Sequence, residues 1–333
     1  MVWIEFLISA AIITFVSIQL AKYGDVIGLR TKLGGAFAGT LLLATATSLP
    51  EVITTISAVR TGIPQLAAGN LFGSNMFNIL LLAILDLAHY RRRISRKNAE
   101  KHALSGSLAV LMIVLAIFFI IAQLPLQIKV GNFVVGADAM VMIAAYFLAM
   151  SLLRKQSRIS SIPVRPEDIP EDVPPLRTAI LWFVSAIVVL VFVTPWMVDA
   201  SGRIAEITGL GATFIGSTLV AVVTSLPELI TTISAAKIGA DDMAIGNLFG
   251  SNMFNMFGLG IADFFFFGGR FFAVIDPSFL LIGVIGLLMT VFALIATLAR
   301  LERRILFLEI DSLILILAYF GGLALLYARG IAP

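Results

Sequence analysis

The chain has 333 residues, of which 59% are hydrophobic and only 13% are charged, and its formal net charge is +3. Soluble domains hold about 25% charged residues, so this composition excludes an ordinary soluble domain and indicates a protein of the lipid bilayer. The absence of cysteine excludes disulfides, thiolate metal ligands and a cysteine nucleophile. The small net charge gives no reason to expect nucleic-acid binding, because the basic residues lie between apolar stretches.

The N-terminal apolar stretch lacks the basic segment of a cleavable signal peptide, so we expect it to be retained as a membrane span. Further apolar stretches follow, and helices of this length can cross about 30 Å of hydrocarbon. We therefore predict an all-α polytopic membrane protein with ten transmembrane helices. In chain order the predicted spans are 3–21, 37–59, 66–88, 103–124, 132–153, 178–199, 211–236, 243–266, 278–299 and 309–328.

Basic residues are distributed unevenly between the two sides that these spans define. With the N-terminus outside, 18 of the 23 Lys and Arg residues fall in loops on the cytoplasmic side. Cytoplasmic loops of membrane proteins are enriched in these residues. The sequence therefore predicts an integral protein of the cell membrane, inner or plasma, with both termini outside.

The longest polar stretch, 154–176, is rich in proline, serine and charged residues, as is typical of a solvated linker. It separates residues 1–153 from residues 177–333, with five predicted spans in each part. We therefore expect two five-helix units joined by a cytoplasmic linker.

The two units share an internal repeat with an offset of 177 residues. Residues 39–78 align with 216–255 without a gap and are identical at 26 of 40 positions. Because each unit has an odd number of spans, the second copy would enter the membrane upside down. Inverted repeats of this kind are typical of secondary transporters, whose substrate site lies at the repeat interface near the membrane midplane.

Both copies contain the sequence Thr-Ser-Leu-Pro-Glu inside an apolar stretch, at 47–51 and 224–228. Pro50 and Pro227 have no N–H for the carbonyls of Ala46 and Val223, so we expect each helix to break and to offer backbone oxygens. Residues four apart share a helix face, which places the threonine beside the glutamate. Each copy thus presents a carboxylate, two hydroxyls and loosened carbonyls in one patch.

Glu51 and Glu228 are the strongest indication of function. A charged side chain at the bilayer centre costs about 2.5–3.5 kcal/mol on insertion scales, so an intramembrane acid is a functional candidate by default. No Lys or Arg is predicted at comparable depth. Carboxylate, hydroxyl, amide and carbonyl oxygens suit a hard cation, and two glutamates would neutralise Ca²⁺. Na⁺ could use the same oxygens, whereas zinc, copper and iron are poorly served without cysteine.

A polar stripe recurs every four residues on the following span of each unit. Its members could contact an ion or could form hydrogen bonds between helices. Asp86 and Asp263 also differ by 177 but lie near the ends of their spans, so helix-end or interfacial roles are favoured over ion access. The stripe consists of Asn70, Ser74 and Asn78 in the first unit and of Asn247, Ser251 and Asn255 in the second.

These motifs resemble the two alpha-repeats of the sodium/calcium exchanger family, within the calcium/cation antiporter superfamily. The repeats of that family look like Gly-Thr…Thr-Ser-x-Pro-Glu followed by Gly-Asn-x-x-Gly-Ser-Asn-x-x-Asn. Here they read Gly39-Thr40…47–51 with 69–78, and Gly216-Ser217…224–228 with 246–255. The resemblance covers about 80 residues, and the ten-span layout fits the rest of the chain.

The resemblance implies a role for each matching residue. Glu51 and Glu228, with backbone oxygens near Thr47 and Thr224, would hold Ca²⁺. One Na⁺ site would be lined by Ser48, Ser74 and the carbonyl of Ala44, and its mirror image by Ser225, Ser251 and the carbonyl of Ala221. Asn78 and Asn255 would sit between the glutamates. Some family members, including potassium-dependent ones, carry aspartate at such a central position, so asparagine at both argues against K⁺ co-transport.

The function expected is secondary active antiport of Na⁺ against Ca²⁺ by alternating access, with spans 1 and 6 moving against the motif helices. A Ca²⁺ or cation/H⁺ antiporter with the same fold and site is the alternative, and a cation channel is a third hypothesis. An enzyme is not expected, since no histidine lies at depth and no Gly-x-Ser-x-Gly motif occurs. The expected partners are Ca²⁺, Na⁺ and lipid, with no cofactor, and the sequence requires no oligomeric partner.

Overall fold

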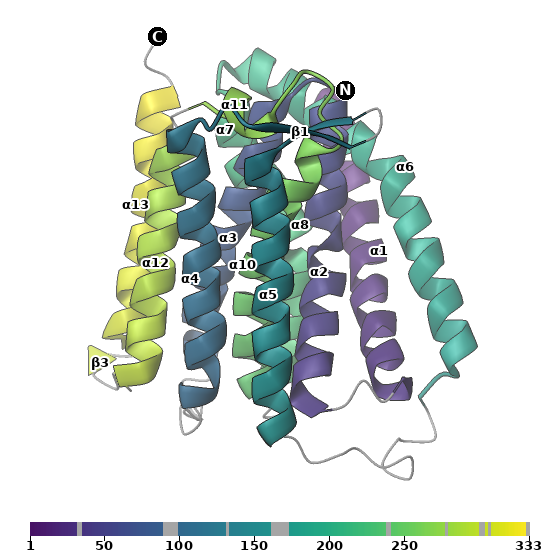
Figure 1. The fold of residues 1–333 in the computed structure, drawn as a ribbon, viewed down its shortest axis with the longest axis vertical. Coiled ribbons are helices and arrows are strands. Elements are labelled where there is room, and N and C mark those ends of the chain that lie inside the picture. The colour runs from purple at the N-terminus through teal and green to yellow at the C-terminus, as the bar shows by residue number, and fades with distance from the viewer. Residues whose placement is uncertain are drawn as a thin grey trace.

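The computed structural model describes nine stretches of the chain, and their helices pack into a bundle (Figure 1). Its first unit contains five long helices: α1 (Val2–Arg30), α2 (Gly35–Arg60), α3 (Pro64–Ala88), α4 (Ala99–Ala122) and α5 (Ala137–Ser160). Most of the predicted linker, residues 161–172, lies outside the described part. The described stretches are 1–31, 35–88, 99–130, 133–160, 173–237, 241–276, 279–299, 304–305 and 308–330.

The second unit begins with α6 (Leu176–Thr208) and continues with a segment made of four short pieces. These are α7 (Ala212–Ile215), the π-helical turn η3 (Gly216–Val220), α8 (Ala221–Thr224) and α9 (Leu226–Lys237). The later helices are α10 (Asp241–Asp263), the short α11 (Phe271–Val274), α12 (Phe279–Ala299) and α13 (Ile310–Gly330).

A short antiparallel hairpin precedes the last helix of each unit. β1 (Gln127–Val130) pairs with β2 (Phe133–Gly136), with Gln127 opposite Gly136, ahead of α5. β3 (Arg304–Ile305) pairs with β4 (Leu308–Glu309) ahead of α13. No strands were predicted: β1 and β3 lie between predicted spans, whereas β2 and β4 overlap the starts of the predicted spans 132–153 and 309–328, where the helices begin only at Ala137 and Ile310.

Seven described helices are long and apolar enough to cross a membrane: α1, α3, α4, α5, α6, α12 and α13. The α7–α9 segment, bent by 43°, is an eighth candidate. Large apolar side chains on the outer helices are exposed, such as Phe192 on α6 and Phe147 on α5, as expected for contact with lipid. The chain is therefore a helical integral membrane protein.

Every predicted span overlaps a described helix or, for 211–236, the broken segment. However, α2 and α10 are not among the helices that satisfy the length and hydropathy criteria. The polar motif lowers the hydropathy of α10, whereas for α2 the side chains of residues 35–42 lie outside the described part. A total of ten membrane crossings therefore stays a prediction.

The motif helices lie in the interior of the bundle, where α2, α3 and α10 contact one another. Figure 1 shows α1 and α6 at one edge and α12 and α13 at the other, with the start of α1 and the end of α13 at the same end. α3 is covered by protein on nearly all sides, since 94% of its most apolar stretch is buried. The polar motifs are thus enclosed by protein and not by lipid.

The two motif prolines act differently. In the second copy the helix is interrupted at Ser225, as predicted, and α9 leaves in a new direction. In the first copy the prediction of a break is wrong, because α2 runs through Pro50 as one helix. The π-helical turn η3 immediately upstream of the second motif shifts the hydrogen-bond register there, which accompanies the bend in this copy.

Candidate functional site

The two motif glutamates face each other across the repeat interface. Glu51 on α2 and Glu228 on α9 are both fully buried. Ser225 Oγ donates a hydrogen bond to Glu51 Oε1, and Ser48 Oγ donates one to Glu228 Oε1, each at 2.9 Å. Each glutamate is therefore held by the serine of the opposite repeat.

A second reciprocal pair joins α3 to α10. Asn78 Nδ2 donates to Asn252 Oδ1, and Asn255 Nδ2 donates to Asn75 Oδ1, each at 3.0 Å. Replacing each partner of one bond by its counterpart in the other repeat gives the other bond. Reciprocity of this kind is the contact pattern of a two-fold axis.

No role was predicted for Asn75 and Asn252. They are identical in the two copies but lie one position away from the four-residue stripe. Their presence in both copies could have indicated a role, but a stripe with a spacing of four residues leaves them out.

The threonine hydroxyls bond close to the predicted backbone ligands. Thr47 Oγ1 donates to the carbonyl of Ala44 at 3.2 Å and lies 3.4 Å from Ser251 Oγ. Thr224 Oγ1 lies within hydrogen-bond reach of the carbonyl of Ala221, at 3.3 Å, and of Asn70 Oδ1, at 3.1 Å.

Ser251 Oγ also lies 3.5 Å from Glu228 Oε1, which places it beside that carboxylate. Asn70 Nδ2 donates to the backbone carbonyl of Glu51 at 3.0 Å and so ties α3 to α2. Ser74 is fully buried on α3, four residues from Asn70 and Asn78. Hydrogen bonds thus link most of the predicted site residues, and Ser74 lies buried on the same stripe.

Several buried oxygens of this cluster have no hydrogen-bond partner. An unpartnered buried polar atom costs free energy, and a buried carboxylate costs most. No group of three or more His, Cys, Asp or Glu side chains able to hold a metal occurs among the described residues. A cation here would therefore use two carboxylates together with neutral oxygens. The open atoms are Glu51 Oε2, Glu228 Oε2, Asn78 Oδ1, Asn255 Oδ1 and Ser74 Oγ.

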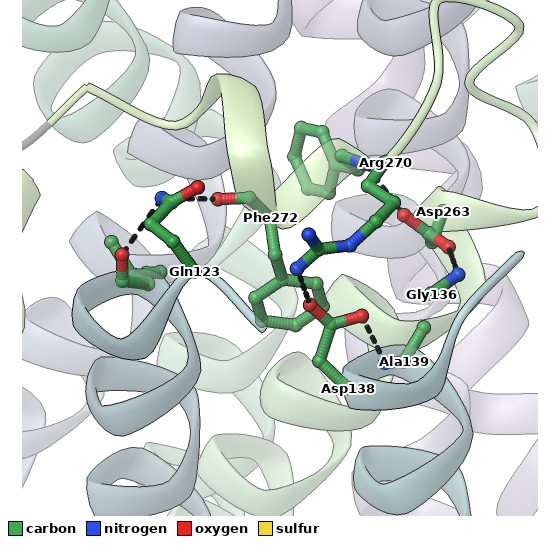
Figure 2. Close-up of polar contacts among 9 residues, drawn as sticks. Gln123, Gly136, Asp138, Ala139, Asp263, Arg270 and Phe272 are labelled. Carbon is green, nitrogen blue, oxygen red and sulfur yellow. Dashed lines mark hydrogen bonds and ion pairs between the residues drawn. The ribbon is translucent and has the colours of Figure 1, made fainter. Parts of the chain in front are cut away.

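Asp263 is the last residue of α10, and Figure 2 shows its carboxylate beside Gly136. Its carboxylate accepts the backbone N–H of Gly136 at 2.7 Å and that of Phe271 at 2.5 Å. Beside it, Arg270 Nη2 pairs with Asp138 Oδ2 at 2.5 Å. Asp263 thus has the helix-end role that its position suggested. Asp86 lies on α3, but its side chain is outside the described part.

The motifs and the fold both have counterparts among known proteins. Residues 1–155 and 178–328 match the family described as sodium/calcium exchanger protein. The inner membrane protein YrbG of Escherichia coli (strain K12) is 30% identical over 219 residues, which are 66% of this chain and 65% of that protein. The aligned region thus spans slightly less than two thirds of this relative.

Solved structures share the fold over nearly the whole chain. The sodium-calcium exchanger NCX_Mj superposes with a TM-score of 0.61 at 20% identity, covering 97% of this chain and 99% of that one. An H⁺/Ca²⁺ exchanger, CAX, gives a TM-score of 0.71 at 12% identity, covering 99% and 85%. At these identities the likeness shows the fold alone.

Proposed function

The chain belongs to the sodium/calcium exchanger family, and we propose that it is a secondary active antiporter that exchanges Na⁺ for Ca²⁺. Proteins of this family move ions across membranes, so a transporter and not an enzyme is the starting point. The ion gradient would supply the energy, and no cofactor is required. The finer assignment depends on the chemistry of the glutamate pair.

The observation that carries the proposal is the pair of fully buried glutamates, each with one carboxylate oxygen held by a serine and the other open. Two carboxylates balance the charge of one Ca²⁺, which takes about six to eight oxygen ligands. The hydroxyl, amide and carbonyl oxygens around them supply the remainder. Na⁺ would compete for the same carboxylates, and that competition couples the two fluxes.

The ligand set that we propose is the one expected from the sequence. Glu51 and Glu228 would bind Ca²⁺ with the backbone near Thr47 and Thr224. Ser48, Ser74 and Ala44 would serve Na⁺ on one side, and Ser225, Ser251 and Ala221 on the other. Asn78 and Asn255 would lie between them.

We propose ten membrane crossings arranged as two inverted five-helix repeats, residues 1–153 and 177–333, in the cell membrane with both termini outside. The reciprocal serine–glutamate and asparagine–asparagine bonds support this arrangement. The start of α1 and the end of α13 at the same end of the bundle fit an even number of crossings (Figure 1).

Alternating access would move α1 and α6 together against the motif helices. These two helices contact each other along their length and also contact α2. Arg203 on α6 pairs with Glu5 on α1, and the rings of Tyr23 and Trp182 stack 5.8 Å apart. Such ties favour movement of the two helices as one body.

H⁺ in place of Na⁺ is the second candidate, because a proton would also satisfy an open carboxylate oxygen of Glu51 or Glu228. A single flux experiment separates the two functions. Liposomes containing the purified protein are loaded with Na⁺ and diluted into Na⁺-free buffer with ⁴⁵Ca²⁺, at equal pH on both sides.

We expect Ca²⁺ uptake that collapses when the Na⁺ gradient is removed. Uptake that ignores Na⁺ but follows an imposed pH gradient would replace Na⁺ by H⁺ as the coupling ion. Uptake that needs neither gradient would indicate a channel, and the antiport proposal would then be wrong.

A further inference from the structure

Residues 53–58 and 230–235, just beyond the two glutamates, are identical in sequence. The hydrogen bonds made in the two copies nevertheless differ. In the first copy, Asn70 uses its whole amide: Nδ2 donates to Glu51 O and to Thr55 Oγ1, at 3.0 and 3.2 Å. Its Oδ1 accepts the hydroxyl of Thr224 at 3.1 Å. The polar atoms of this asparagine are therefore satisfied by protein alone.

The counterpart of Asn70 in the second copy is Asn247, which is also fully buried. Its Nδ2 donates to Thr231 Oγ1 at 3.3 Å, and its Oδ1 has no partner. Thr231 Oγ1 lies 2.8 Å from the carbonyl of Pro227, to which it donates its hydrogen, so it can only accept from the amide. This bond fixes the orientation of the amide and leaves Oδ1 open.

The counterpart of Thr55 is Thr232, whose side chain is 1% exposed and whose Oγ1 also has no partner. Asn247 on α10 bonds Thr231, the residue next to Thr232 on α9, and these two helices pack against each other. The open oxygens of Asn247 and Thr232 thus belong to the same part of the α9–α10 contact.

The open oxygens adjoin the glutamate site. Thr232 lies four residues after Glu228 on α9, so the two side chains share a helix face. Glu228 Oε2 is open as well. One carboxylate oxygen and two neutral oxygens make a ligand set with a single negative charge, which suits a monovalent hard cation better than Ca²⁺.

We propose that Asn247 and Thr232 form a Na⁺ subsite one helical turn from Glu228, on the side toward Lys237. An ion in this subsite would pass between the glutamate pair and that end of α9. Asn70 and Thr55 form no such subsite in this conformation, because they satisfy each other. The inference rests on the proposed antiport function.

Thr232→Val, with Thr55→Val as the matched control, tests the subsite. Both changes replace a hydroxyl by a methyl group at the same position of the motif. The midpoint of thermal unfolding of the purified protein is measured against Na⁺ alone and against Ca²⁺ alone, since a ligand that binds the folded state raises this midpoint.

For Thr232→Val we expect the half-effective Na⁺ concentration to rise about three- to tenfold, the range expected for one lost hydroxyl ligand, with the Ca²⁺ response unchanged. Thr232→Ser should restore the Na⁺ response. Thr55→Val should lower the midpoint without any ion and leave the Na⁺ response as it is. Asn247→Asp, which adds a charge at the open oxygen, should strengthen Na⁺ binding and gives a second test if Thr232→Val does not fold.

Three results would overturn the subsite: an unchanged Na⁺ response in Thr232→Val, an equal loss for Na⁺ and Ca²⁺, or the same Na⁺-selective loss in Thr55→Val. If Thr232→Val does not fold, Asn247→Asp decides, and unchanged or weaker Na⁺ binding overturns the subsite. A wild-type protein that neither responds to Na⁺ nor shows Na⁺-driven Ca²⁺ flux would instead overturn the proposed function. The two failures are therefore distinguishable.

Discussion

Arg270→Met should destabilise the protein strongly, because it removes one partner of a buried ion pair. Arg270 and Asp138 are 7% and 0% exposed, and their side chains are 2.5 Å apart (Figure 2). Without the guanidinium, the Asp138 carboxylate keeps the hydrogen bond from the Ala139 N–H at 2.9 Å but has lost its counter-charge. Breaking a buried pair in this way costs about 3–5 kcal/mol.

The assay is the free energy of unfolding from SDS titration in mixed micelles. Replacing both partners, as in Arg270→Met with Asp138→Asn, should cost much less than the single change, because no uncompensated charge remains. Arg203→Met is the matched control: Arg203 pairs with Glu5 and Asp199 at the surface, where solvent screens the charges, so its loss should be far smaller.

Equal losses for Arg270→Met and Arg203→Met would refute the reasoning, and so would a double variant as unstable as Arg270→Met alone. Either result would mean that the buried Asp138 carboxylate does not depend on Arg270 for its counter-charge. The contact between the start of α5 and the segment that leads into α11 would then have to depend on the Asp263 hydrogen bonds and on the buried Phe271 and Phe272.

Two further predictions concern a close helix contact and the serine–glutamate bonds. Gly73→Ala should impair folding, because a Cβ there would lie 2.5 Å from Ser217 Cα. Gly321→Ala, where a Cβ would meet nothing within 4 Å, should instead stabilise α13 by up to about 1 kcal/mol. Equal folded yields of the two variants after purification would contradict this. Ser48→Ala and Ser225→Ala should each lower the free energy of unfolding in ion-free buffer by about 1.5–3 kcal/mol, because each removes one hydrogen bond to a glutamate. The same SDS titration measures the loss. An effect confined to one serine would show that the two halves of the site are not equivalent.

The helices and the meeting of the two glutamates were predictable from the sequence. Apolar stretches of membrane-spanning length set the positions of the helices, because burial in lipid dominates the local choice of structure. The 177-residue offset, combined with an odd number of spans in each unit, implied that Glu51 and Glu228 would approach from opposite directions. Ser48 and Ser225 hold these carboxylates reciprocally, as that geometry suggests.

Other features depend on tertiary contacts that a single sequence does not reveal. Identical Thr-Ser-Leu-Pro-Glu motifs gave one continuous helix and one broken one, so the motif alone does not decide whether the helix breaks. Arg270 finds Asp138 from a position 132 residues away. Such pairings are set by how the α11 segment docks on the first unit.

The central claim is that Glu51 and Glu228 form one cation site from two half-sites. Equilibrium binding of ⁴⁵Ca²⁺ to the purified protein, with Na⁺ as competitor, tests it most directly. We predict one Ca²⁺ per chain, displaced by Na⁺ and lost in both Glu51→Gln and Glu228→Gln, because each variant removes half of the charge that balances Ca²⁺. Two Ca²⁺ per chain, or full binding in either variant, would contradict the account.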